Sequence, residues 1–218
     1  VYVGSYAGKD SNGIWVFEMD AAGKLSPIGG ASGVENPSFL ALSPTGKFLY
    51  AACETYGPNG GTVAAFALDP KTGIPSLLNQ QSSKGQGPCY IALDKNGRHV
   101  LTANYGSGSV ASLPIGEDGK VGAAISSIQH EGASKVNLQR QNEVHAHSIN
   151  FDEQNRFAVA ADLGADKLFV YQFDAKSGAL TPNSPAFATT AAGAGPRHFA
   201  FHPNGKFGYA INELNSTI

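Results

Sequence analysis

The 218-residue sequence predicts an all-β fold, and within that class a β-propeller built from four-stranded antiparallel blades. Three observations lead to this prediction. A block of two apolar strands joined by a Gly or Asn turn occurs four times, and its turns lie 51, 58 and 50 residues apart. That period accommodates about four short strands, which is typical of a propeller blade. In addition, 27 glycines and 12 prolines punctuate many short strands, and no segment has a helical period of useful length.

The recurring block supplies the first two strands of each blade, which we name a and b. Its four copies are residues 36–54, 87–105, 145–163 and 195–213. The residues at the centres of the a–b turns are Gly46, Gly97, Asn155 and Gly205. Glycine adopts positive φ without steric cost and asparagine tolerates it, so these residues suit a tight turn between two strands.

A second recurring hairpin supplies strands c and d. The c strands are expected at residues 13–17, 62–66, 109–113 and 167–171, which are rich in β-branched and aromatic side chains. Asp/Gly turns such as residues 69–73 and 174–178 follow them and predict a return strand. The nearest candidate for a helix, residues 186–195, consists mostly of small residues and is predicted to be a loop.

The order of these blocks predicts a single propeller domain over residues 1–218 with about four and a half blades. Residues 1–6 match strand b of a repeat, and residues 195–218 break off where strand c begins. A propeller closes by pairing its first and last strands, and an open array would leave a strand edge exposed. We therefore expect an incomplete fragment that needs further C-terminal blades to close the ring.

Composition argues against several classes of partner. The net charge is −2 and no cluster of Lys and Arg occurs, so nucleic acid is not an expected partner. No apolar run approaches the roughly 20 residues of a membrane-spanning helix. The two cysteines, Cys53 and Cys89, form neither a disulfide framework nor a metal motif, and both are predicted to be small buried residues. A cytoplasmic location without metal or cofactor fits this sequence best.

Chemistry is expected where the repeats differ at equivalent positions. Eight residues before the a–b turn, the four copies carry Ser38, Cys89, His147 and Arg197. The ends of the b strands carry Cys53 and Glu54, Asn104 and Tyr105, Asp162 and Leu163, and Asn212 and Glu213. In an antiparallel hairpin these two sets meet at one edge, and strand a is the innermost strand of a blade. Both sets should therefore surround one mouth of the central channel.

The last two copies bring together His147, Arg197, His198, Asn212 and Glu213. An imidazole, a fixed cation and a carboxylate in a concave site suit acyl or proton-transfer chemistry. The alternative is a structural salt bridge between Arg197 and Glu213.

A long connection over residues 129–144 should cover the same mouth. Its polar residues, together with the histidine that follows it, are His130, Lys135, Asn137, Arg140, Gln141 and His145. Arg140 is the one expected to contact an anionic substrate, because a guanidinium suits bidentate contacts with an oxyanion.

The motifs at residues 145–148 (HAHS), 161–164 (ADLG), 195–198 (GPRH) and 212–214 (NEL) resemble the seven-bladed lactonase family. That family includes bacterial 6-phosphogluconolactonase and fungal carboxy-muconate cyclase. The resemblance covers the whole chain and implies active-site roles for His147, Arg197 and Glu213. It also implies a further arginine beyond residue 218, since seven blades of this period need about 350 residues.

The resemblance implies a lactone hydrolase, most simply a 6-phosphogluconolactonase of the pentose phosphate pathway. Glu213 or His147 would act as general base, and Arg197 would stabilise the oxyanion. The expected substrate is an anionic sugar lactone, with binding contacts expected from Arg140, His145, His198, Asn212 and Asp162. A carboxy-muconate-type cycloisomerase and a non-catalytic binding propeller remain alternatives. No metal is expected for this reaction.

Overall fold

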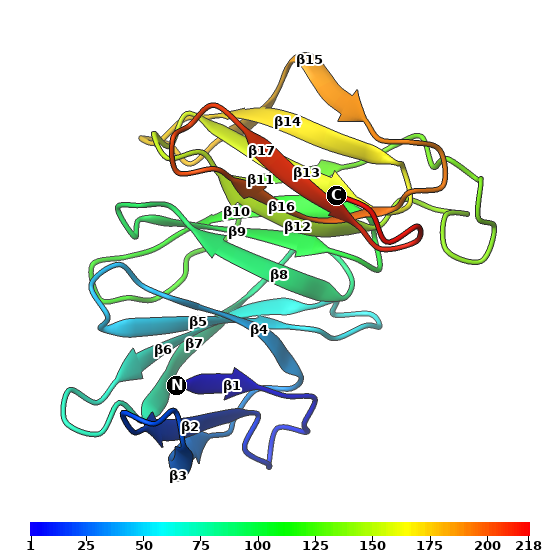
Figure 1. The fold of residues 1–218 in the computed structure, drawn as a ribbon. Helices are drawn as coiled ribbons and strands as arrows, with labels where there is room; N and C mark the ends of the chain where they lie inside the picture. The colour runs from blue at the N-terminus through cyan, green and yellow to red at the C-terminus, as the bar shows by residue number, and fades with distance from the viewer.

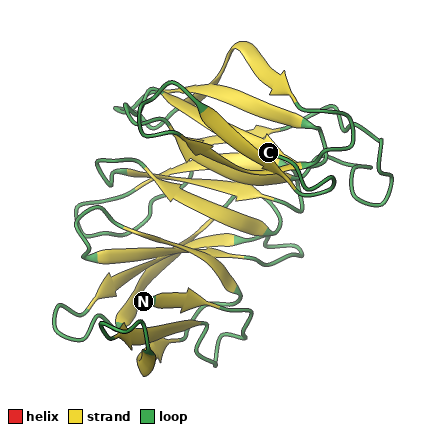
Figure 2. Cartoon of the chain, viewed as in Figure 1, coloured by secondary structure: helices red, strands yellow, loops and turns green.

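The computed structural model describes all 218 residues, which form strands, turns and loops without helices (Figure 2). Five antiparallel sheets follow one another in chain order, from the N-terminal sheet at the bottom of Figure 1 to the C-terminal sheets at the top. The all-β prediction is confirmed. The chain has no helix long and apolar enough to span a membrane.

The strands fall into these sheets in sequence order. The first sheet contains β1 (Tyr2–Gly4), β2 (Ile14–Met19) and β3 (Leu25–Ala31). The second contains β4 (Pro37–Leu42), β5 (Phe48–Cys53), β6 (Thr62–Leu68) and β7 (Pro75–Ser82). The third contains β8 (Pro88–Leu93), β9 (His99–Asn104), β10 (Ser109–Pro114) and β11 (Ser126–Gln129). The fourth contains β12 (Ala146–Phe151), β13 (Phe157–Asp162), β14 (Lys167–Phe173) and β15 (Leu180–Thr189), and the fifth contains β16 (Pro196–Phe201) and β17 (Gly208–Asn212).

The sheets are propeller blades with strand order a-b-c-d. Three of them have four strands, while the first has three and the last has two, so the predicted blade pattern is confirmed. The a–b turns are also as expected, because Gly46, Gly97, Asn155 and Gly205 have φ of 68°, 66°, 54° and 67°. One prediction is wrong in part. Residues 186–189 belong to β15 and not to a loop, since Phe187 and its neighbours pair with β14.

The hydrophobic core lies between neighbouring blades. Three clusters of buried residues each join two successive sheets, and one of them packs Leu101 and Val110 of the third sheet against Ile149 and Tyr171 of the fourth. Many of the other members are alanines of strands b and c, whose small side chains let the sheets stack closely. The innermost strands β4, β8, β12 and β16 contact one another in that order. This stacking brings the start of each inner strand to a common mouth.

Candidate active site

A β-bulge interrupts each of the four inner strands, β4, β8, β12 and β16, at its second residue. The pairing of strands a and b skips one residue in each blade, and the skipped residues are Ser38, Cys89, His147 and Arg197. These are the positions where the four sequence copies differ. A bulged residue leaves the ladder and its side chain is re-aimed, which is why bulges recur next to active sites. The bulge therefore turns one variable side chain of each blade toward the mouth.

The four bulged residues line one cavity of about 440 Å³. The other lining residues are Tyr6, Phe39, Glu54, Tyr56, Tyr105, Arg140 and His198. The eleven lining residues come from the inner strands of the last four sheets and from the loops that follow β1, β5, β9 and β11. The cavity thus gathers all four of the predicted strand-start residues, but of the eight predicted strand-end residues only Glu54 and Tyr105 line it.

Two arginines share one carboxylate at this mouth. Arg140 Nη2 donates to Glu213 Oε1 at 2.6 Å, and Arg197 Nη1 donates to Glu213 Oε2. Arg140 also donates to the Tyr105 hydroxyl at 3.3 Å. Burial raises the pKa of Glu213, but the hydrogen bonds from both arginines outweigh this effect, so the pKa lies below its ordinary value. Glu213 is therefore an ionised group that holds two guanidiniums, and those side chains remain 40% and 44% exposed.

His147 is a neutral imidazole beside Arg197. Its Nδ1 lies 3.8 Å from Cys89 Sγ, and its ring is 5.5 Å from that of His198. Burial, with the nearby charge of Arg197 as the second cause, lowers the pKa of His147 to about 4. The same two causes lower the pKa of His198. Both rings are therefore uncharged at pH 7, and an uncharged imidazole can accept a proton from water.

His145 lies behind the cavity wall. Its ring stacks on Tyr105 with centroids 4.4 Å apart, and its Nδ1 is 2.9 Å from the Tyr105 carbonyl oxygen. Tyr105 lines the cavity and receives a hydrogen bond from Arg140. His145 thus contacts a residue of the wall, although the sequence analysis expected it to contact substrate.

Asp162 and Asn212 were expected to bind substrate, and the structure corrects both. They are the last residues of β13 and β17 and pair with Ala146 and Pro196. The contacts of both side chains are within the protein. The Asp162 side chain is 0% exposed, and the Asn212 amide donates to Thr217 Oγ1 at 3.0 Å. Neither lines the cavity. In the second and third blades, the residues that directly follow strand b, Glu54 and Tyr105, do line it.

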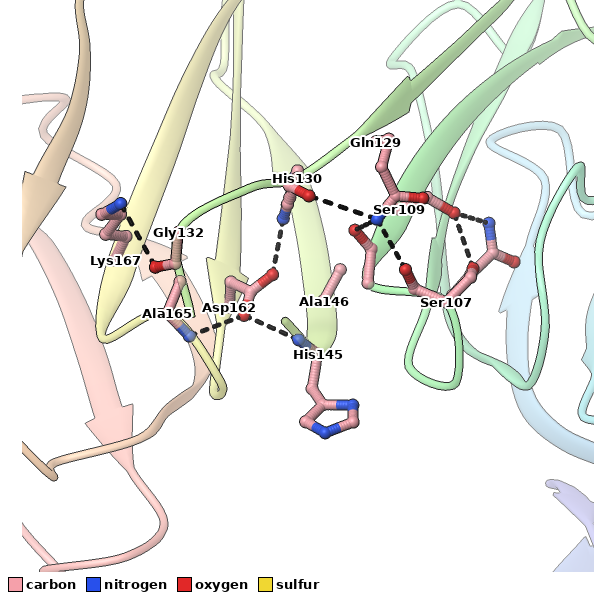
Figure 3. A network of polar contacts seen from close by, with 12 residues as sticks. Ser107, Ser109, Gln129, His130, Gly132, His145, Ala146, Asp162, Ala165 and Lys167 are labelled. Atoms are coloured by element: carbon pink, nitrogen blue, oxygen red, sulfur yellow. Dashed lines mark hydrogen bonds and ion pairs between the residues drawn. The ribbon is translucent and has the colours of Figure 1, made fainter. Parts of the chain in front are cut away.

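Asp162 instead fastens the long connection between β11 and β12. Its carboxylate accepts hydrogen bonds from the backbone nitrogens of His145 and Ala165 at 2.8 and 2.9 Å, and lies 2.7 Å from His130 Nδ1 (Figure 3). His130 Nε2 lies 2.7 Å from the Tyr171 hydroxyl. All of these groups are buried or partly buried, so the network fixes both ends of the loop that carries Arg140.

Gln141 gives the same loop a second anchor. Its amide donates to the Leu163 carbonyl at 2.9 Å and to Asp166 at 2.7 Å, and its side chain is fully buried. Among the polar loop residues singled out in the sequence, Arg140 alone lines the cavity. His130, Lys135, Asn137 and Gln141 do not.

We expect Asp162→Ala to lower the free energy of unfolding by about 3–5 kcal/mol, because it leaves His130 and two backbone N–H groups buried without an acceptor. Urea denaturation measures this loss. Asp174→Ala is the matched control, since Asp174 caps an exposed turn in the same blade. Its expected loss is below about 1 kcal/mol. Equal losses in the two variants would contradict the structural role of Asp162.

Sequence reasoning missed part of the cavity. Glu54 and Tyr105 were placed at the mouth as strand-end residues equivalent to Glu213, but no role was predicted for them. Tyr6 and Tyr56 lie in loops outside the repeat, and Phe39 follows a bulge, so no repeat comparison singles them out. The structure contains no group of three or more His, Cys, Asp or Glu side chains placed to hold a metal ion.

Comparison with known proteins identifies relatives over the whole chain. The family model described as "Lactonase, 7-bladed beta-propeller" matches residues 1–218. The chain is 39% identical over 219 residues to a 6-phosphogluconolactonase of Bacillus subtilis and 34% identical over 222 residues to one of Formosa agariphila. These alignments cover all of this chain but 60% and 62% of the relatives' lengths.

A solved structure is similar in fold and in sequence. The periplasmic gluconolactonase PpgL of Pseudomonas aeruginosa superposes with a TM-score of 0.89 at 34% identity. The match covers 98% of this chain and 61% of that protein. The chain therefore spans about three fifths of the length of the proteins that it resembles.

Proposed function

Because the chain belongs to the seven-bladed β-propeller lactonase family, we propose that it carries the catalytic groups of a lactone hydrolase that acts on 6-phosphogluconolactone. The observation that carries the proposal is the neutral His147 beside two guanidiniums that Glu213 holds at the cavity mouth. Relatives that align over the whole chain are named 6-phosphogluconolactonase, which supports this choice of substrate. The reaction would place the protein in the pentose phosphate pathway.

In the proposed mechanism, His147 is the general base. Its imidazole takes a proton from water while the water oxygen forms a bond to the lactone carbonyl carbon, and the carbonyl electron pair moves onto the oxygen. Arg197 donates hydrogen bonds to this oxyanion. When the tetrahedral intermediate collapses, the bond between the carbonyl carbon and the ring oxygen breaks. The ring oxygen receives the proton from His147, and the products are a free hydroxyl and a carboxylic acid, which ionises at neutral pH.

Glu213 is the less suitable base. Both of its carboxylate oxygens accept hydrogen bonds from arginines, and it does not line the cavity, whereas His147 does. Its proposed role is to orient Arg140 and Arg197. A guanidinium has five N–H donors, so each arginine retains donors for the substrate after pairing with Glu213. Arg140 would hold the phosphate, with His198 beside it, and so fix the lactone carbonyl at His147.

The test is hydrolysis of 6-phosphogluconolactone above its spontaneous rate by the source protein that contains this chain. The pH profile adds a specific expectation. Since the pKa of His147 lies near 4, kcat/KM should hold between pH 7 and about pH 5 and fall as the imidazole becomes protonated toward pH 4. Glucono-δ-lactone suits the profile because it has no phosphate to titrate. A limb near pH 6.5 would contradict the assignment of His147, and no turnover would contradict the function.

We also propose that the protein acts in the cytoplasm. Cys53 and Cys89 are free thiols and one of them lies in the cavity, which suits a reducing compartment. Fractionation of the source cells tests this location.

A further inference from the structure

The wall of the cavity that belongs to the first two blades carries a different chemistry from the arginine wall. Tyr6 follows β1, Ser38 is the bulged residue of β4, and Glu54 and Tyr56 follow β5. None of these four residues has a role in the mechanism above. Three offer hydroxyl groups and one offers a carboxylate, and the wall has no Lys or Arg.

Glu54 is a carboxylate without a cationic partner. The Tyr6 hydroxyl donates to its Oε2 at 2.8 Å, and no other residue donates to the side chain. The five ion pairs of the structure do not include it, whereas Glu213 takes part in two of them. Glu54 Oε1 therefore remains as a free acceptor in the cavity. The hydrogen bond to Glu54 raises the pKa of Tyr6 to about 12, so the phenol keeps its proton and its oxygen can still accept.

Ser38 adds a second unused group. Its Oγ is buried and has no hydrogen-bond partner within the protein, although the residue lines the cavity. A buried hydroxyl without a partner is uncommon in folded proteins, because the lost hydrogen bond with water is not replaced. Ser38 Oγ thus has hydrogen-bonding capacity that the protein leaves unused beside the cavity.

These groups recognise neutral hydroxyls and not anions. An unpaired carboxylate accepts hydrogen bonds from hydroxyl groups and repels phosphate or carboxylate. The cavity is consequently divided, with cations at Arg140 and Arg197 and acceptors at Glu54 and Tyr6. Tyr56, an exposed aromatic ring beside Glu54, supplies the apolar surface that ligand cavities combine with a few placed polar groups.

We propose that Tyr6, Ser38 and Glu54 form a hydroxyl-binding wall that recognises the polyhydroxylated carbon chain of the substrate. This inference rests on the proposed lactonase function and deepens it, because it names the part of the substrate that selects sugar lactones over lactones without hydroxyls. It also orients the substrate, with its anionic end at the arginines and its hydroxyls at Glu54. A site built to bind hydroxyls rejects analogues that lack them strongly, since its own polar groups are then left unpaired.

The test compares kcat/KM for glucono-δ-lactone with that for δ-valerolactone, which has the same ring size and no hydroxyls. Glu54→Gln keeps the size of the side chain but removes the charge that strengthens its hydrogen bonds. We expect the ratio of the two kcat/KM values to fall by about tenfold or more in Glu54→Gln, in line with loss of a charge-assisted hydrogen bond. Glu18→Gln, at an exposed position of β2, is the control and should keep the wild-type ratio. A purely structural role of Glu54 would lower both values in parallel and leave the ratio unchanged, which would overturn the inference.

Calorimetric binding of D-gluconate and hexanoate separates this inference from the proposed function. Both ligands are six-carbon carboxylates, and gluconate alone has hydroxyls. If neither of these lactones nor 6-phosphogluconolactone is hydrolysed, but gluconate binds more tightly than hexanoate and Glu54→Gln removes that preference, the hydroxyl-binding wall is supported and the lactonase function fails. If no turnover and no preference for gluconate are found, both fail. If turnover is found, and Glu54→Gln keeps both the preference for glucono-δ-lactone over δ-valerolactone and the preference for gluconate over hexanoate, only the wall is overturned.

Discussion

Arg197→Ala is expected to lower kcat/KM for 6-phosphogluconolactone by about 10²- to 10³-fold, the loss typical of removing one donor to a developing oxyanion. Arg197 is the bulged residue of β16, and its guanidinium lies at the cavity mouth, fixed by Glu213. Arg197→Lys keeps the charge but lacks the planar fork, so an intermediate loss is expected. Steady-state kinetics on the source protein measures these effects.

The control for this variant is Arg156→Ala. Arg156 is an exposed arginine that pairs with Asp152 on the turn between β12 and β13, away from the mouth. Its removal should leave kcat/KM within about twofold and stability within about 0.5 kcal/mol. If Arg197→Ala behaved like this control, Arg197 would be a surface ion-pair residue, as in the salt-bridge alternative.

His147→Gln is expected to reduce kcat by about 10²- to 10⁴-fold with a small effect on KM, the range for loss of a general base. The amide of glutamine cannot take a proton from water, yet it occupies a similar volume at this largely buried position. The acid limb near pH 4 should disappear from the residual rate, because it arises from protonation of the same imidazole. Single-turnover and steady-state rates across pH measure both effects.

Glu213→Gln distinguishes the two candidate bases. If Glu213 only orients the arginines, this variant should raise KM and lower kcat moderately while the limb near pH 4 remains, since that limb belongs to His147. The pattern expected for a base at Glu213 is the reverse, with a large loss of kcat in Glu213→Gln and a nearly normal rate in His147→Gln. That result would move the general base to Glu213.

The blade architecture was predictable because its signals are local. The Gly or Asn at the a–b turn, the apolar strands on either side and the period of 50 to 58 residues all follow from turn stereochemistry and strand length. The set of variable residues eight positions before the a–b turn was predictable for the same reason, because residues at the same position of a sequence repeat lie at the same place in each blade. Ser38, Cys89, His147 and Arg197 accordingly share one cavity.

The errors concern the direction in which side chains point. Asp162 and Asn212 were placed at the mouth with their neighbours, but neither lines the cavity, since Asp162 contacts His130 and Asn212 donates to Thr217. A shift of one residue reverses the face of a side chain, and strand ends are not resolved to one residue in a sequence. The same uncertainty hid the bulge, which depends on the pairing of two strands.

Turn chemistry and repeat spacing along this chain thus determine the blades and the equivalent positions, one in each blade, that line the candidate active site. The tertiary structure decides which groups meet there, because Arg140, Glu213, Tyr6 and Glu54 come from elements far apart in sequence. Arg140 reaches Glu213 through a loop that is held by buried contacts with the next blade. The protonation state of His147 also follows from its surroundings. Burial and the charge of Arg197 lower its pKa to about 4, which the sequence alone does not reveal.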